Sequence, residues 1–362
     1  MSDSANTRTL EAKKWLTPQR VWMAITGAVL VSAAVIGWSV WQGASWKSLS
    51  ALSLNGAWLA VALGCVLLRD VGYVIRLMIL ARGELTLKRA TSSILLWELA
   101  SALTPSVVGG SAVASFILHR NGLSWGRSLA TVMSTALLDE LYFLLTVPLV
   151  AFAVGWSAFL PETAPWLEHS VLTIFIGGYA FMFILAALLS SALFWAPNRA
   201  RQGLISFFHL RLFRRWSDAG RRLAGDLRQA SIDLKTMSLG HWLIASGATA
   251  ISWTARFMTL NALFMAMVST LLSNSVGLSQ FDIWARQLSM WTVMMVSPTP
   301  GSSGLAELAL PTFMSGVIPM SLTATAWAAL VLMWRYLTYH LYVLVGGALM
   351  PVWLAQTTSR RK

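Results

Sequence analysis

Ten charged residues lie inside the apolar stretches of this 362-residue chain. An ionised side chain is costly in such surroundings, so each is a candidate for an ion pair or for binding a polar ligand. They are Arg69, Asp70, Arg76, Glu98, Asp139, Glu140, Arg256, Arg286, Glu307 and Arg335. We expect Arg69, Arg256 and Arg335 to neutralise an anionic ligand. The acids that would orient these arginines or engage an amine are Glu98, Asp139, Glu140 and Glu307.

The spacing of these residues along the sequence indicates which of them share a helix face and which face the interior. Arg69 and Arg76 are seven residues apart, so on a helix they share one face. Arg76 lies near the end of its apolar stretch, and we expect it to reach out to the polar surface. Asp139 and Glu140 are adjacent and point in different directions, so at least one should face the interior. Arg256 would either pair with one of these two acids or contact a ligand.

Two turns rich in proline and glycine interrupt apolar stretches. The first runs from Thr104 to Gly110 and the second from Ser297 to Gly304. Proline stops the incoming helix, and glycine lets the backbone turn and approach a neighbour closely. We expect the two turns to form the floor and roof of a binding cavity. The residues that they add to the predicted site are Pro105, Gly109, Gly110, Pro300, Gly301 and Gly304.

A helix should begin near Gly304, with Glu307 in its first turn. The free N–H groups at the start of a helix attract anions, so a phosphate group would suit this position. The carboxylate of Glu307 would block that site if it caps the helix itself. Both alternatives stay open at this point.

The sequence contains no pattern typical of catalysis or cofactor binding. The turn Gly301-Ser-Ser-Gly304 does not match the G-x-S-x-G motif of serine hydrolases, and no P-loop is present. The five histidines lack the spacing of metal ligands, and the single cysteine, Cys65, excludes a cysteine zinc site. We therefore expect no catalytic residue, no metal and no cofactor.

The elements that position these residues are expected to be transmembrane helices. Apolar residues make up 56% of the chain and charged residues only 11%, against about 25% in a soluble domain. This balance excludes a water-soluble enzyme and predicts an all-α polytopic membrane protein. Six stretches reach the length of about 20 residues that a bilayer requires. They are residues 21–41, 54–81, 127–154, 171–195, 241–272 and 322–354.

Two further apolar stretches are broken in the middle by the turns. Their arms, each 13 to 16 residues long, are 91–104 and 106–118 in the first and 282–297 and 305–318 in the second. Such arms are too short to cross comfortably, and irregular backbone at membrane depth survives only inside protein or beside a water-filled cavity. We expect two re-entrant or discontinuous helical hairpins.

Basic residues gather in alternate connections. The rich segments are 1–20, 82–89, 120–127, 199–235 and 360–362. The positive-inside rule places them in the cytoplasm, which also explains the net charge of +13 without a nucleic-acid partner. We expect one membrane domain, residues 21–355, between cytoplasmic tails of residues 1–20 and 356–362. The predicted location is a bacterial inner membrane.

With this orientation the two broken elements enter from opposite sides. Each lies between two long spans, in repeats of about residues 54–154 and 241–354. This is the plan of an inverted repeat, which places a binding site near the membrane midplane.

The basic segment within residues 196–239 is predicted to be amphipathic. Nine basic residues between positions 199 and 235 alternate with apolar ones at roughly helical spacing. It would either lie on the anionic inner leaflet or serve as a loop that only sets topology.

The motifs together resemble the flippase-like transmembrane domain of lysylphosphatidylglycerol synthases. The resemblance rests on Pro105 with Gly109 and Gly110, on Asp139, and on the stretch from Pro298 to Glu307. It implies a stand-alone member without the aminoacyl-transferase domain, acting on membrane lipids. The expected function is a lipid translocator whose cavity shelters a polar or anionic headgroup. The alternatives are a membrane enzyme or a scaffold in lipid or isoprenoid metabolism, for example of hopanoids.

Overall fold

The computed structural model of the chain is helical in the part that it describes. The described residues are 26, 53–104, 106–161, 165–209, 217–271, 279–295, 302, 304–318 and 322–359. The helices are α4 (Gly56–Leu80), α5 (Leu87–Leu103), α6 (Ser106–Arg120), α7 (Trp125–Val154), α8 (Trp156–Phe159), α9 (Pro165–Ser190), α10 (Pro197–His209), α11 (Ser217–Lys235), α12 (Leu239–Leu271), α13 (Gln280–Met294), α14 (Leu305–Phe313), α15 (Ala324–Arg335) and α16 (Leu341–Ser359). Two π-helical turns, η1 (Ser191–Trp195) and η4 (Tyr336–His340), extend α9 and join α15 to α16.

Side chains at the helix starts set several of these boundaries. Backbone N–H groups of the first turn donate to Asn55 at α4, Ser124 at α7, Ser279 at α13 and Thr323 at α15. A capping oxygen satisfies a donor that the helix itself leaves without an acceptor. The end of α7 is fixed by Gly155, whose φ of 85° suits glycine.

Four helical segments of the described chain are long and apolar enough to cross a membrane. They are Gly56–Leu80, Trp125–Val154, His169–Trp195 and Ala324–Thr357. Large apolar side chains on their outer faces are exposed, and Phe152 reaches 92%. An apolar surface of this kind suits lipid rather than water. The predicted all-α membrane fold is therefore confirmed. The predicted first span, residues 21–41, lies outside the described part apart from residue 26.

Helix α12, 33 residues long, packs along α4. Gly72 of α4 permits the close approach, because a Cβ there would lie 2.2 Å from Ser252 Oγ and 2.9 Å from the Ala248 carbonyl oxygen. Ser252 Oγ donates to the carbonyl oxygen of Arg69 at 2.9 Å. Small residues at such contacts are typical of helix pairs in membranes.

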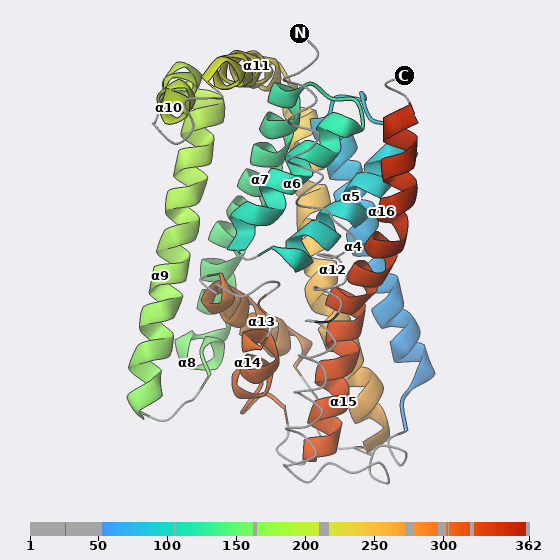
Figure 1. Cartoon of the computed structure of the whole chain (residues 1–362). Helices are drawn as coiled ribbons and strands as arrows, with labels where there is room; N and C mark the ends of the chain where they lie inside the picture. The colour runs from blue at the N-terminus through green and yellow to red at the C-terminus, as the bar shows by residue number, and fades with distance from the viewer. Residues whose placement is uncertain are drawn as a thin grey trace.

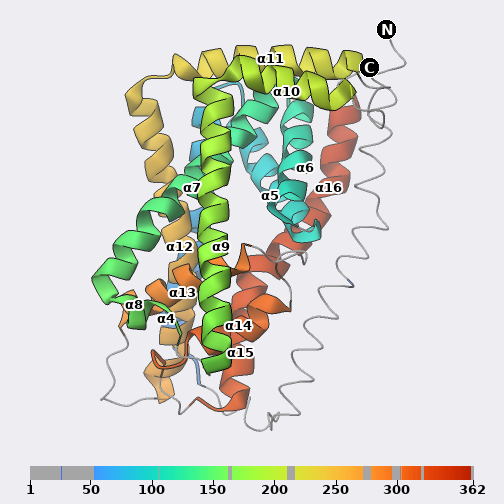
Figure 2. The same cartoon turned by 90° about the vertical axis from the view of Figure 1, so that its left-hand side faces the viewer.

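Two helix pairs, α5 with α6 and α13 with α14, lie in opposite halves of the molecule (Figure 1). Helices α5 and α6 lie in the half that carries α10 and α11, and both views agree on this (Figure 2). The long helix α12 extends along both halves of the molecule (Figure 1). The predicted turn residues Pro105, Pro300 and Gly301 lie outside the described part of the chain.

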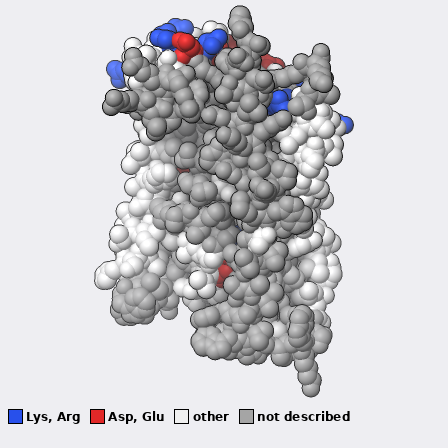
Figure 3. All heavy atoms as spheres, in the orientation of Figure 1, with Lys and Arg blue, Asp and Glu red and all other residues white. Residues whose placement is uncertain are grey.

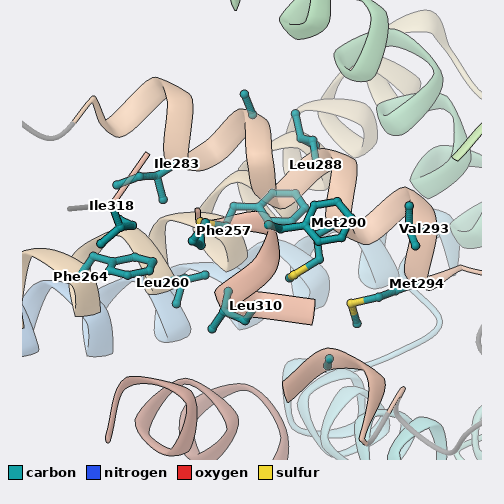
Figure 4. Close-up of a cluster of buried hydrophobic side chains, with 14 of the residues drawn as sticks. Phe257, Leu260, Phe264, Ile283, Leu288, Met290, Val293, Met294, Leu310 and Ile318 are labelled. Carbon is teal, nitrogen blue, oxygen red and sulfur yellow. The ribbon is translucent and has the colours of Figure 1, made fainter. Parts of the chain in front are cut away.

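Helix α13 lies within the main hydrophobic core. Its Ile283, Leu288 and Met290 pack with Phe257 of α12 and Leu310 of α14 (Figure 4). On the side of α9 a Cβ at Gly178 would lie 2.3 Å from the Thr292 carbonyl oxygen, so the two helices approach closely there. Because α13 packs against α9, α12 and α14, protein contacts fix its position.

The basic segment forms α10 and α11, which lie across one end of the bundle (Figures 1 and 2). Arg127 of α7 pairs with Asp233 of α11 at 2.7 Å and with Glu84 at 2.9 Å. A Cβ at Gly126 would lie 2.1 Å from the backbone of Asp226, so α7 contacts α11 closely. Most charged atoms visible on the face in Figure 3 lie at this end. The segment is thus a pair of docked helices.

Candidate functional site: a charged cavity inside the bundle

A cavity of about 290 Å³ lies inside the bundle. Both helix pairs contribute to its wall, with Ser101 of α5 and Ser111 of α6 from one and Met290 and Trp291 of α13 from the other. The charged residues of the wall are Arg76, Glu98, Asp139, Glu140, Arg256 and Arg335. A mostly apolar wall that carries a few charged groups is typical of a ligand site.

Arg69 and Glu98 join α4 to α5 by an ion pair at the edge of the cavity. The Arg69 side chain is only 1% exposed, and it also lies 3.9 Å from Asp70. Its guanidinium stacks over the ring of Tyr342, 4.4 Å from the centroid, and the Tyr342 hydroxyl donates to Asp70 at 2.9 Å. Arg69 therefore interacts with protein groups on several sides and is not part of the cavity wall.

Arg76 and Asp139 form a second ion pair, between α4 and α7. Trp253 Nε1 donates to the same Asp139 oxygen at 2.7 Å, and Arg76 donates to Thr249 Oγ1 at 3.3 Å. The Arg76 side chain is buried. The expectation that Arg76 reaches out to the polar surface is wrong, because this carboxylate holds it inside the bundle.

Tyr73 lies between the two arginines of α4. Their guanidinium carbons are 5.2 Å (Arg69) and 4.8 Å (Arg76) from the centroid of the Tyr73 ring. The predicted shared face is confirmed, and an aromatic ring between the two charges stabilises both of them.

Arg335 and Glu307 form a third pair, 2.7 Å apart and almost fully buried. The other Glu307 oxygen accepts the backbone N–H of Gly304, also at 2.7 Å. Glu307 thus caps α14, and its carboxylate occupies the helix start. Of the two alternatives for this end, the structure has the capping one.

Arg256 makes no ion pair within 4 Å in the described chain, unlike Arg76 and Arg335. It is half-buried on α12, and its guanidinium lies 5.4 Å from the ring centroid of Trp253 and 5.1 Å from that of Trp291. Of the two alternatives for Arg256, the ion pair with Asp139 or Glu140 is not formed. A cation held by two indole rings keeps its hydrogen-bond donors available to a ligand.

Glu140 is the second charged residue of the cavity wall that forms no ion pair within the described part of the chain. It is 4% exposed, and its Oε2 atom has no hydrogen-bond partner there. Its neighbour Asp139 also lines the cavity, so both acids face the interior. Burial of a carboxyl without a donor is unusual, which makes Glu140 a candidate functional residue.

The predicted glycines have different roles. A Cβ at Gly110 would lie 2.5 Å from Ser101 Oγ and 3.1 Å from Ser101 Cα, so this glycine lets α6 approach α5. Gly109 precedes it in α6. Gly304 has a φ of 85° and forms the cap of α14.

Sequence reasoning missed the aromatic residues of the site. The rings of Tyr73, Tyr342, Trp253 and Trp291 contact arginines of the bundle interior, yet none was predicted as a site residue. Helical spacing was the available signal, because Tyr73 lies four residues after Arg69 and Trp253 three residues before Arg256. Among the described residues no group of three or more potential ligands for a metal ion is found.

The helices and the cavity define an α-helical membrane protein with a charged internal cavity. The chain belongs to the family of the lysylphosphatidylglycerol synthase TM region, whose model matches residues 25–346. It is also similar to a protein described as a UPF0104 membrane protein from Archaeoglobus fulgidus. The two are 24% identical over 341 residues, which cover 90% of this chain and 92% of the archaeal one.

Proposed function

We propose that this protein is a lipid translocator. A polar headgroup enters the central cavity while the acyl chains stay in the bilayer. The single observation that carries this is Arg256, the one cavity arginine without an ion pair in the described chain. An unpaired cation in a largely apolar cavity is costly unless an anion joins it, and a lipid phosphate is an anion.

The two helix pairs are proposed to be re-entrant hairpins that enter from opposite leaflets within an inverted repeat. Their position in opposite halves of the molecule supports this (Figure 1). Broken helices that meet near the midplane form the substrate sites of several transporter folds. The proposed repeats are residues 54–154 and 241–354.

The orientation is proposed from the basic end of the molecule. Helices α10 and α11 would lie against the anionic inner leaflet of the cell membrane, with the chain termini in the cytoplasm. The arginines of these helices and the exposed ring of Phe207 in α10 support this position.

Reconstitution tests the proposed function. The protein is placed in vesicles with fluorescent phosphatidylglycerol, and the accessible fraction is followed after a quencher is added. We expect protein-dependent movement that Arg256→Gln abolishes and Arg256→Lys keeps in part, because lysine retains the charge but loses the planar fork. The control is Arg82→Gln, which removes one positive charge outside the cavity.

Two outcomes would contradict the proposal. One is no movement of any bacterial lipid by the folded protein. The other is an equal rate for wild type and Arg256→Gln. A covalently altered lipid in the vesicles would instead favour a membrane enzyme.

A further inference from the structure

We infer that Glu140 is a proton-binding site of the cavity, neutral in the arrangement described here, which releases its proton when water reaches the cavity. Only the coupling of this proton to lipid movement rests on the proposed function. The starting observation is a side chain that is 96% buried, lines the cavity, and has an oxygen without a hydrogen-bond partner in the described structure.

The charged groups on the surrounding helices interact with residues other than Glu140. Arg76 of α4 pairs with Asp139, Glu98 of α5 with Arg69, and Arg335 of α15 with Glu307. Arg256 of α12 lies over its two indole rings.

The other elements around α7 also carry titratable groups. Tyr179 of α9 donates to the carbonyl oxygen of Leu144 at 3.0 Å, and Arg286 of α13 is buried. Asp233 of α11 pairs with Arg127 near the start of α7. None of these groups forms an ion pair with Glu140 within 4 Å in the part of the chain described, and its nearest charged neighbour along the chain, Asp139, is another acid.

Electrostatics then favours the protonated carboxyl. An ionised carboxylate without a cation is strongly disfavoured in a buried site, and the negative charge of Asp139 adds to that penalty. When the cavity opens, water hydrates the carboxylate, the O–H bond breaks, and the proton passes to a water molecule. The protonation state of Glu140 therefore follows the access of water to the cavity.

This exchange couples the proton to an anionic ligand. A phosphate group next to Arg256 would meet no charge at a protonated Glu140 and a like charge at an ionised one. Because like charges in one cavity repel, a bound anion and a bound proton favour each other. The ligand class expected from this is a lipid with a monoanionic phosphodiester headgroup.

Infrared difference spectroscopy tests the inference directly. Purified protein in phosphatidylglycerol nanodiscs is titrated from acidic to alkaline pH, and the carbonyl-stretch band of protonated carboxyls is recorded. Among the bands of the chain's fourteen Asp and Glu residues, we expect one that Glu140→Gln removes and that the matched control Glu84→Gln keeps. Glu84 lies outside the cavity and pairs with Arg127. If Glu140→Gln fails to fold, Glu140→Asp is used, and the band should shift in frequency.

The outcomes separate this inference from the proposed function. Identical difference spectra for wild type and Glu140→Gln would overturn the proton site. In the vesicle assay wild type should change its rate with pH, and Glu140→Gln should lose that dependence. A Glu140 band without any lipid movement would instead leave the proton site standing and remove the translocator.

Discussion

Arg335 Nε lies 2.7 Å from a carboxylate oxygen of Glu307, and this contact joins the middle of one long segment to the start of a short helix. The second Glu307 oxygen accepts a hydrogen bond from the backbone N–H of Gly304. One carboxylate thus satisfies a buried cation and caps α14. The π-helical turn η4 follows Arg335 directly and brings Thr338 and Tyr339 into the cavity wall. Turns of this kind inside helices are frequent at functional sites.

Removing the charge of Glu307 should destabilise the protein strongly. Glu307→Gln removes the carboxylate charge that faces the buried Arg335, and breaking a buried pair in this way costs about 3–5 kcal/mol. The measurement is the free energy of unfolding in detergent. In Glu307→Gln/Arg335→Met the second change should restore part of the loss, because the buried cation is removed as well. A double variant as unstable as Glu307→Gln would contradict the ion-pair account.

A methyl group at Gly72 should separate α4 from α12. Gly72→Ala would place its Cβ 2.2 Å from Ser252 Oγ and 2.9 Å from a backbone oxygen, which cannot move independently. Overpacking of this kind costs about 1–3 kcal/mol. The control is Gly64→Ala on the same helix, where a Cβ would have no neighbour within 4 Å. Thermal unfolding of both variants should show a loss only for Gly72→Ala, and equal losses would count against the close approach.

The sequence predicts where the helices of this molecule lie along the chain better than it predicts which side chains contact one another. Apolar stretches and broken arms locate the long helices and the two helix pairs, because span length and proline positions are local properties. The partner of Arg76 is not local, and neither is one of the two rings that contact Arg256. Arg76 is held by an acid 63 positions away. Arg256 lies over Trp253, three residues before it on α12, but also over Trp291 of α13. Which carboxylate a buried arginine reaches depends on helix rotation and crossing, and no spacing rule along one helix fixes these.

The hydrogen bond from Trp253 to Asp139 should contribute to stability. Trp253→Phe keeps an aromatic ring but removes the N–H that donates to Asp139 at 2.7 Å. Hydrogen bonds to charged groups are worth about 1.5–3 kcal/mol, so a loss of this order is expected. The matched control is Trp156→Phe, because Trp156 is half exposed and lies in α8. If Trp253→Phe unfolds like wild type, the bond does not contribute.

The ring of Tyr73 should stabilise the two arginines that flank it, and its hydroxyl should not be needed for this. Tyr73→Phe keeps both guanidinium contacts, at 5.2 and 4.8 Å, and should unfold like wild type. Tyr73→Leu removes both contacts, and with each worth from about 0.5 to 2 kcal/mol we expect a clear loss of stability. The pair of variants isolates the ring from its hydroxyl, and chemical denaturation in detergent measures each. Equal stability of the two would show that Arg69 and Arg76 are held by Glu98 and Asp139 alone, while a loss in Tyr73→Phe would assign the effect to the hydroxyl.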